Sequence, residues 1–336
     1  MRRRALALAL AGAALVLLGV AAIAAQLRWA LSPALDAAPP LIFEVQPGAS
    51  LGEVARELEA RGVIRSALAF KLLARYRDLE RALQIGEYEL SAAHAPDEIL
   101  TRIAEGRVVT YEIVLPEGIT ASQVAQRLEA AGVADAAAFL AFARDAASAT
   151  ALGVEGQTLE GYLFPETYRL PRGLSVREIA ATLVGAFLEV WRELEPEARR
   201  QRMSMREVVT LASIVEKETA VPDERPLIAA VFRNRLERGM RLETDPTVIY
   251  GIPDFDGNLR RADLENAQNP YNTYQIAGLP PGPIANPGAD SLRAVVHPAE
   301  SRSLFFVSRN DGTHEFSDTY DDHVRAVNRY QRSRSR

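Results

Sequence analysis

An uncharged apolar run near the amino terminus constrains this chain more than any other feature of its sequence. Residues 5–25 consist only of Ala, Leu, Val, Gly and Ile, and as a helix they would extend about 31 Å, enough to cross the hydrocarbon core of a bilayer. Arg2, Arg3 and Arg4 precede the run, so the positive-inside rule keeps residues 1–4 in the cytoplasm. The sequence predicts a single-pass helix in the cytoplasmic (inner) membrane, with the body of the protein outside the cytoplasm.

A cleaved secretory signal is the alternative interpretation of this run. Ala22-Ile23-Ala24 has the small-x-small form of a cleavage site, but the apolar region of a signal peptide usually covers only about 7–15 residues. The length of the run therefore favours an anchor. Residues 26–40, with Pro33, Pro39 and Pro40, are expected to form a short linker that cannot sustain a helix.

Composition excludes several classes of function. The 336 residues predict two or three folded units. With no Cys and four scattered His, the chain offers no disulfide framework, thiol nucleophile or close metal-binding pair, so we expect no metal and no cofactor. Its formal charge of −5 has the wrong sign for holding a polyphosphate, so no nucleic-acid partner is expected.

A weak internal repeat appears at an offset of 70 residues. Residues 54–63 and 124–133 share Val-Ala, Leu-Glu-Ala and Gly-Val at matching positions. In each copy an alternating stretch leads through a Gly turn into a helix that begins after Ser50 or Thr120, which predicts strand, turn, helix. A common α/β pattern explains two copies as well as a duplication does. The first copy continues through a helical stretch over 67–83 and a strand over 86–90, and residues 41–108 resemble a LysM-like, glycan-binding module.

The remaining chain divides by composition. Residues 109–155 read as a connecting α/β unit with an alanine-rich helix, and residues 156–336 as a catalytic domain. Residues 159–168 are expected to form a loop or edge segment, residues 176–238 are helical in period, and Gly and Pro punctuate a long irregular region over 241–298. The predicted fold class is α+β.

One helix in this domain carries a carboxylate where an apolar side chain is expected. Ser204 and Glu207 form a capping box that opens a helix over 205–218. At 100° per residue from Leu211, Glu218 falls at about −20°, on the apolar stripe, and Glu216 at about 140°, on the side expected to be solvated. Burial would raise the pKa of Glu218 and suit it to general acid catalysis. The alternative is that Glu218 lies past the last buried turn and pairs with a surface cation.

The irregular region alternates hydroxyls, amides and aromatic rings with rigid turns, at 241–251, 270–274 and 278–284. Such side chains suit sugar rings, which offer hydroxyl edges and apolar faces. For each stretch taken singly, ordinary packing of Pro/Gly loops is the favoured explanation.

In these stretches the chain resembles the endolytic murein transglycosylases of the YceG-like group, membrane-anchored enzymes that cut peptidoglycan glycan strands. The resemblance is carried by residues 160–168, 211–219, 242–251, 271–274 and 278–298. By position, the catalytic glutamate of the family falls on Glu218, on a helix like that of lysozyme-like enzymes, and Tyr271-Asn272 look like their cleft-lining Tyr-Asn pair. The chain departs from the family pattern at Glu166, where Asp is frequent, and at Pro270, where Ala is usual.

The resemblance implies a lytic transglycosylase that cleaves the MurNAc–GlcNAc bond of nascent strands, leaves 1,6-anhydro-MurNAc ends and ends strand elongation near peptidoglycan synthases. It implies that Tyr271, Asn272 and Tyr274 orient the substrate and that Thr244, Asp245, Thr247 and Tyr250 line the opposite wall. Glu160, Tyr162 and Glu166 would shape a subsite or serve the structure only. Two alternatives remain open: a hydrolytic muramidase in which Asp245 or Glu166 activates water, and a scaffold that binds peptidoglycan without cutting it.

Overall fold

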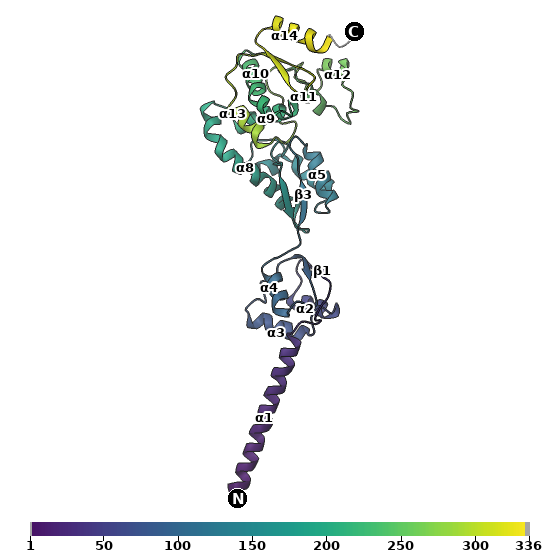
Figure 1. Ribbon diagram of the computed structural model, residues 1–336, viewed down its shortest axis with the longest axis vertical. Helices are drawn as coiled ribbons and strands as arrows, with labels where there is room; N and C mark the ends of the chain where they lie inside the picture. Colours follow the sequence, from purple (N-terminus) through teal and green to yellow (C-terminus); the bar gives the residue numbers. More distant parts are fainter. Residues whose placement is uncertain (1, 333–336) are drawn as a thin grey trace. The chain divides into compact units, whose positions relative to one another are not determined.

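The computed structural model describes residues 2–332, so Met1 of the expected cytoplasmic tail and residues 333–336 of the expected catalytic domain lie outside it. The chain forms two compact units, and Figure 1 shows the elements of each. Unit 1 covers Met1–Tyr111 and Pro171–Gly173, and unit 2 covers Glu112–Leu170 and Leu174–Arg336. The structure confirms a mixed α+β chain that begins with an apolar helix.

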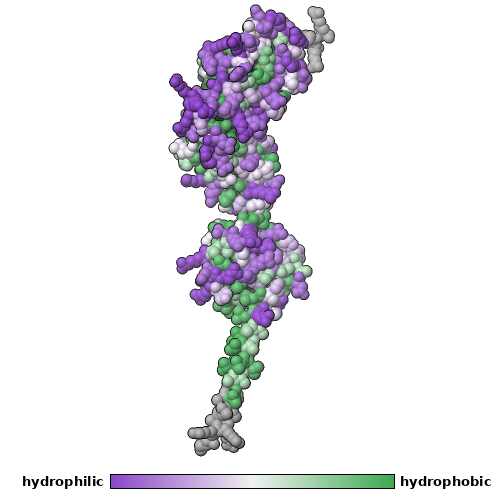
Figure 2. Space-filling view, turned by 60° about the vertical axis from the view of Figure 1, so that its left-hand side comes forward, coloured by the Kyte–Doolittle hydropathy of each residue, from purple (hydrophilic) through white to green (hydrophobic). Residues whose placement is uncertain are grey.

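Helix α1 spans Arg2–Ala30. Its segment Leu10–Ala30 has a mean hydropathy of 2.2 and no buried residue in its most apolar window, so it is long and apolar enough to cross a membrane. Figure 2 shows the apolar surface that α1 presents. The expectation that the linker is non-helical is wrong for residues 26–30, because no Pro or Gly interrupts the helix before Pro33.

The segment between α1 and the first strand is held against unit 1. Arg65 Nε donates to Pro33 O at 3.0 Å, and Ser91 Oγ donates to Ala38 O at 2.8 Å. The Leu35 amide donates to Ala92 O at 3.0 Å. Residues 31–40 therefore follow the surface of the folded module instead of forming a free tether.

The rest of unit 1 has the order strand, helix, helix, strand, helix. Its elements are β1 (Leu41–Val45), α2 (Leu51–Ala60), α3 (Ala67–Tyr76), β2 (Gly86–Leu90) and α4 (Pro96–Ala104). β1 pairs antiparallel with β2, with Phe43 opposite Tyr88, and both side chains are fully buried beside Phe70. The helix expected over 67–83 ends at Tyr76, and Asp78 then takes a positive φ of 53°.

Unit 2 opens with a similar order, in which a third helix comes before the second strand. Its elements are β3 (Tyr111–Val114), α5 (Ala121–Ala130), α6 (Ala136–Arg144), α7 (Ala146–Ala151) and β4 (Thr167–Leu170), and β3 pairs with β4. In both copies a complete capping box opens the helix, Ser50 with Glu53 and Thr120 with Gln123. The predicted strand–turn–helix repeat is confirmed. The segment 159–168, expected to be a loop or edge segment, enters strand β4 at Thr167, and both strands of this two-stranded sheet are edge strands.

The larger part of unit 2 is helical, with one hairpin near its end. It contains α8 (Val176–Arg200), α9 (Met205–Glu218), the 3₁₀ turn η1 (Pro222–Glu224), α10 (Arg225–Glu237), α11 (Asp245–Tyr250), α12 (Arg261–Glu265), α13 (Ala289–Val296), β5 (Phe305–Ser308), β6 (His314–Ser317), α14 (Tyr320–Val327) and the π-helical turn η2 (Asn328–Arg332). β5 and β6 pair antiparallel, and α14 packs against both strands.

Helix α9 lies at the centre of this unit, where α8, α10, α11 and α13 pack against it. All of its residues from Val208 to Val215 are buried. The expectation that Glu216 faces solvent is therefore wrong. The Glu216 side chain is 6% exposed, lies 3.1 Å from Arg225 Nη2 and accepts the Gly288 amide at 3.0 Å. With neighbouring elements on every side of α9, a charge on its far face must be paired inside the protein.

Candidate active site

Glu218 is the last residue of the central helix. A capping box begins this helix, in which the Ser204 amide donates to Glu207 Oε2 at 2.8 Å and the Glu207 amide donates to Ser204 Oγ at 3.3 Å. The chain leaves the helix at Thr219, whose φ and ψ of −142° and 139° are extended. A carboxylate in the last turn faces the negative end of the helix dipole, which disfavours its ionised form.

A group of buried threonines holds the carboxyl of Glu218 from the other side. Thr244 Oγ1 donates to Glu218 Oε1. Thr244 is itself fixed, because its amide donates to Thr273 Oγ1 at 3.0 Å and its carbonyl accepts Thr247 Oγ1 at 2.8 Å. All three threonines are at most 3% exposed. The donor to Glu218 is therefore positioned before any substrate arrives.

Burial raises the pKa of Glu218, and the nearby Asp245 raises it further. The Thr244 hydrogen bond and the charges of His314 and Arg235 oppose this shift without cancelling it. The carboxyl therefore keeps its proton to a higher pH than an ordinary glutamate. A group that must give a proton near neutral pH needs this property.

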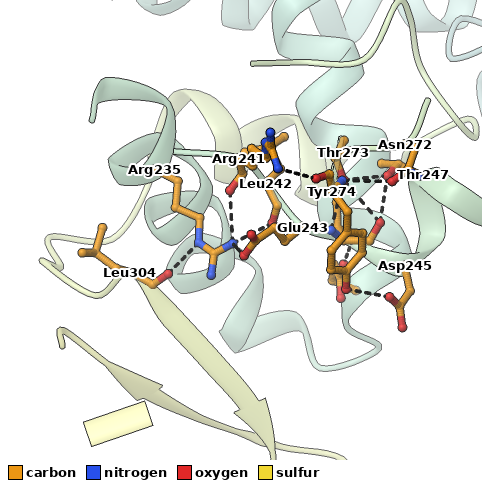
Figure 3. Close-up of polar contacts among 12 residues, drawn as sticks. Arg235, Arg241, Leu242, Glu243, Asp245, Thr247, Asn272, Thr273, Tyr274 and Leu304 are labelled. Carbon is orange, nitrogen blue, oxygen red and sulfur yellow. Dashed lines mark hydrogen bonds and ion pairs between the residues drawn. The ribbon is translucent and has the colours of Figure 1, made fainter. Parts of the chain in front are cut away.

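Glu218 opens into a cavity of about 480 Å³. The other residues that line it are Arg235, Leu242, Glu243, Asp245, Tyr274, Phe306, Val307, Ser308, His314, His323, Val327 and Gln331. On one wall Tyr274 OH donates to Asp245 Oδ1 at 2.8 Å (Figure 3). Of the residues expected to bind substrate, Asp245 and Tyr274 thus share this cavity with Glu218, while Thr244 contacts its carboxyl and Thr247 supports Thr244 from behind.

Asn272 lies beneath this wall and not on it. Its side chain is fully buried, and Nδ2 donates to the carbonyls of Asp263, Leu264 and Asn266 at 3.1, 3.1 and 2.9 Å. Its Oδ1 accepts the Tyr274 amide at 3.0 Å. The contacts of Asn272 therefore fix the loop that carries Tyr274 and leave no side-chain donor free for a ligand.

A second cavity, of about 670 Å³, contains Glu160 and Tyr250. Tyr250 OH donates to Glu160 Oε2 at 3.1 Å, and the Ala121 amide donates to Oε1 at 2.9 Å. Burial raises the pKa of Glu160 to about 7. The Tyr250 ring also packs edge-on against Tyr271, with ring centres 4.8 Å apart. Tyr250, Tyr271 and Glu160 are thus grouped with one another and do not line the Glu218 cavity.

The two other residues of the expected subsite lie apart from both groups. Tyr162 is fully buried, donates its hydroxyl to Glu155 O at 2.9 Å and packs edge-on against Phe187. Glu166 is exposed at the start of β4. Neither residue lines the cavity of Glu218.

Sequence reasoning missed the basic wall of this cavity. Arg235 is 7% exposed, and its guanidinium donates to Leu304 O at 2.7 Å and to Leu242 O at 2.8 Å (Figure 3). His314 comes from the hairpin and His323 from α14. These residues are spread over about ninety positions, so no local spacing connects them with Glu218. Within the described part of the chain, no three His, Asp or Glu side chains are grouped to hold a metal ion.

Comparison with known proteins identifies the family of this mixed α+β chain. The YceG-like family model matches residues 43–329. The chain therefore belongs to the YceG-like family.

Two bacterial relatives are both named endolytic murein transglycosylase. The protein of Bacillus subtilis (strain 168) is 29% identical over 324 residues, which cover 89% of this chain and 87% of the relative. The protein of Streptococcus pneumoniae (strain D39) is 27% identical over 84% of this chain, which spans only 57% of that longer protein. The crystal structure of a YceG-like protein from Listeria monocytogenes matches with a TM-score of 0.59 and 35% identity, over 85% of this chain and 98% of that one.

Proposed function

We propose that this chain is a peptidoglycan lytic transglycosylase in which Glu218 is both the acid and the base. The observation that carries the proposal is the Glu218 carboxyl, which is partly buried at the end of α9, accepts a hydrogen bond from Thr244 and lines a cavity that a sugar can enter. Membership of the YceG-like family and the names of the two relatives support the same activity.

In the proposed reaction, protonated Glu218 gives its proton to the oxygen that links MurNAc to GlcNAc. The glycosidic bond breaks as positive charge develops at the anomeric carbon. The carboxylate then takes the proton of the MurNAc C6 hydroxyl, whose oxygen bonds to the anomeric carbon and closes a 1,6-anhydro ring. No water is consumed, and Glu218 is protonated again at the end. Because the attacking hydroxyl belongs to the substrate, little entropy is lost in bringing it to the reacting carbon.

The surrounding side chains take different parts in this proposal. Thr244 stabilises the carboxylate that forms when Glu218 gives up its proton, and Tyr274 with Asp245 contacts the glycan. Asn272 is a positioning residue that acts through the Tyr274 loop. Tyr250, Tyr271 and Glu160 would bind a more distant part of the strand, at the second cavity.

Three other parts of the chain fit an enzyme that acts on a long polymer. We propose that the strand–helix–helix–strand unit of residues 41–108 is a LysM-like module that binds glycan, and that α9 corresponds to the active-site helix of lysozyme-like enzymes. We further propose that α1 anchors the chain in the cytoplasmic membrane with its body outside, where the enzyme cuts nascent strands internally and ends their elongation beside the synthases.

Hydrolysis by a muramidase is a second candidate, because Asp245 shares the cavity with Glu218. With two carboxylates in one site, Asp245 could activate a water molecule while Glu218 protonates the leaving oxygen. Glu166 is exposed and does not line this cavity, so it is the weaker base.

Mass spectrometry of the fragments released from peptidoglycan sacculi distinguishes these functions. The full-length chain in detergent is expected to release fragments that are lighter by one water than the hydrolytic products. Glu218→Gln is expected to abolish release while the thermal unfolding temperature is retained. Only hydrolytic ends would exclude the lyase and favour Asp245 as base. Binding of sacculi without any release by the wild-type chain would favour the non-catalytic scaffold.

A further inference from the structure

His314 lies on the wall of the Glu218 cavity and forms a hydrogen-bonded pair with Glu224 that the proposed reaction does not use. Glu224 is the last residue of η1, and His314 is the first residue of β6. The His314 amide donates to Glu224 Oε1 at 2.8 Å, and His314 Nδ1 lies 2.6 Å from Glu224 Oε2. The side chain of His314 is 14% exposed and that of Glu224 is 11% exposed, so this contact is largely protected from water.

The pair is also tied to the end of α9. Thr219, which directly follows Glu218, donates Oγ1 to Glu224 Oε2 at 3.4 Å. The His314 ring packs edge-on against Phe306, with ring centres 5.5 Å apart and planes at 88°. The carboxylate and the aromatic ring together fix the orientation of the imidazole relative to Glu218.

The Nε2 atom of the His314 imidazole has no hydrogen-bond partner among the described residues. Nδ1 is bound by Glu224, and His314 lines the same cavity as Glu218. A carboxylate at Nδ1 orients a histidine so that Nε2 is available to a ligand. Sugar hydroxyl and acetamido groups complement Nε2, which accepts a hydrogen bond when the ring is neutral and donates one when it is charged.

We propose that His314, oriented by Glu224, contacts the glycan through Nε2 and acts on the Glu218 carboxyl that shares its cavity. The inference rests on the proposed function and adds to it a substrate-contacting residue. Protonated His314 favours the carboxylate that Glu218 becomes after it gives up its proton. The other titratable or charged groups that face the cavity are Arg235 from α10, Glu243 and Asp245 at the start of α11, Tyr274 from its loop and His323 from α14.

Binding without turnover tests the contact directly. Glu218→Gln in the full-length chain in detergent is titrated with a purified GlcNAc–MurNAc tetrasaccharide, with and without His314→Gln. We expect His314→Gln to weaken binding about tenfold, since a hydrogen bond to the glycan is lost. His297→Gln, at an exposed histidine after α13, is the matched control and should leave the Kd unchanged. An unchanged Kd for His314→Gln would overturn the contact.

Turnover tests the second part of the inference. His314→Gln is expected to lower kcat/KM about 10- to 100-fold and to move the alkaline limb of the pH–rate profile to higher pH, because Glu218 loses a neighbouring cation. Glu224→Gln should shift both quantities the same way by less. A limb that stays in place, or a loss of activity that merely follows a lower unfolding temperature, would show a structural role only. A wild-type chain that binds the tetrasaccharide through His314 but releases no anhydro product would refute the lyase and leave the contact standing.

Discussion

At the scale of single residues, the contact between Thr244 and Glu218 determines how strong an acid the site contains. The threonine hydroxyl donates to the carboxyl, which stabilises the ionised form against the effect of burial. Thr244→Val removes this donor, so the pKa of Glu218 should rise further. We expect the alkaline limb of kcat/KM to move to higher pH and kcat to fall by up to about tenfold, measured as anhydro-product release against pH.

Thr244→Ser is the matched control for this substitution because it keeps the hydroxyl. Its pH–rate profile should stay within experimental error of the wild type. If Thr244→Val and Thr244→Ser have superimposable alkaline limbs, the hydroxyl does not act on Glu218.

Glu160 makes the stability of unit 2 depend on pH. Its pKa of about 7 in the folded chain lies above its ordinary value of 4.5. Below about pH 4.5 both states bind the proton, and as the pH rises to 7 the unfolded state loses it first, so stability falls across this window. Between pH 4.5 and 8, ionisation of Glu160 should lower the free energy of unfolding by about 1–3 kcal/mol. Glu160→Gln should lack this contribution to the pH dependence.

Urea denaturation over this pH range measures the slope. The chain has two tryptophans, and in a Trp29→Phe background Trp191 of α8 reports on unit 2 alone. Glu166→Gln, at an exposed position of the same segment, is the control. Parallel pH dependences for wild type and Glu160→Gln would contradict the raised pKa.

The position of Glu218 could be predicted from the sequence because it depends on local geometry. The helix period placed the side chain on the buried stripe, and the capping box at Ser204 fixed the start of that helix. The role of Asn272 could not be read in this way. Its amide binds carbonyls of α12 and of Asn266, six to nine residues earlier, and only the folded structure shows that no donor is left for a sugar.

At the scale of elements, the stability of α9 in the fold depends on a charge pair on the side of the helix opposite its apolar stripe. Glu216 and Arg225 are 6% and 9% exposed in their side chains, and Glu117 also lies 3.1 Å from Arg225. Glu216→Gln would leave the buried guanidinium with its more exposed acidic partners only. We expect a loss of about 3 kcal/mol in the free energy of unfolding, measured by urea denaturation with Trp191 fluorescence.

An exposed ion pair provides the comparison for this loss. Glu265→Gln breaks a contact with Arg261 in which both side chains are more than half exposed, and should change the free energy by less than about 0.5 kcal/mol. Equal effects of the two substitutions would mean that the Glu216 pair is not shielded from water.

The repeated elements could be predicted because their signals are local. Capping residues and helix-ending glycines stand at the same places in both copies, and each copy closes with a second helix and a paired strand. The environment of Glu216 could not be predicted from the helix period. A period shows which side is apolar, but whether the other side meets water depends on α10 and α13, which come later in the chain.

At the scale of the whole molecule, α1 should determine where the protein resides. Leu17 and Leu18 are exposed in the middle of the apolar segment. Replacing both with Arg costs about 2.5–3.5 kcal/mol per residue for membrane insertion. We expect the double variant to leave the carbonate-washed membrane fraction, whereas Leu17→Ile with Leu18→Ile should remain there. Retention of the double Arg variant in that fraction would argue against a spanning helix.

The absence of cysteine makes the sidedness of the anchor directly measurable. Ala37→Cys introduces a single thiol at an exposed position just after α1. A membrane-impermeant maleimide should label it in intact spheroplasts if the body lies outside the cytoplasm. Labelling that requires lysis would reverse the proposed orientation.

The docked segment after α1 has a mechanical consequence. Residues 31–40 are hydrogen-bonded to the module of residues 41–108. In addition, Arg65 of this module stacks over the ring of Trp29, which lies in the last turn of α1, at 4.9 Å. In the proposed orientation, no flexible linker separates the bilayer from the module of residues 41–108 that we propose binds glycan. The distance of that module from the membrane is then fixed by the chain itself. Lengthening residues 31–40 with a flexible insert should therefore change which layer of the wall the module can reach.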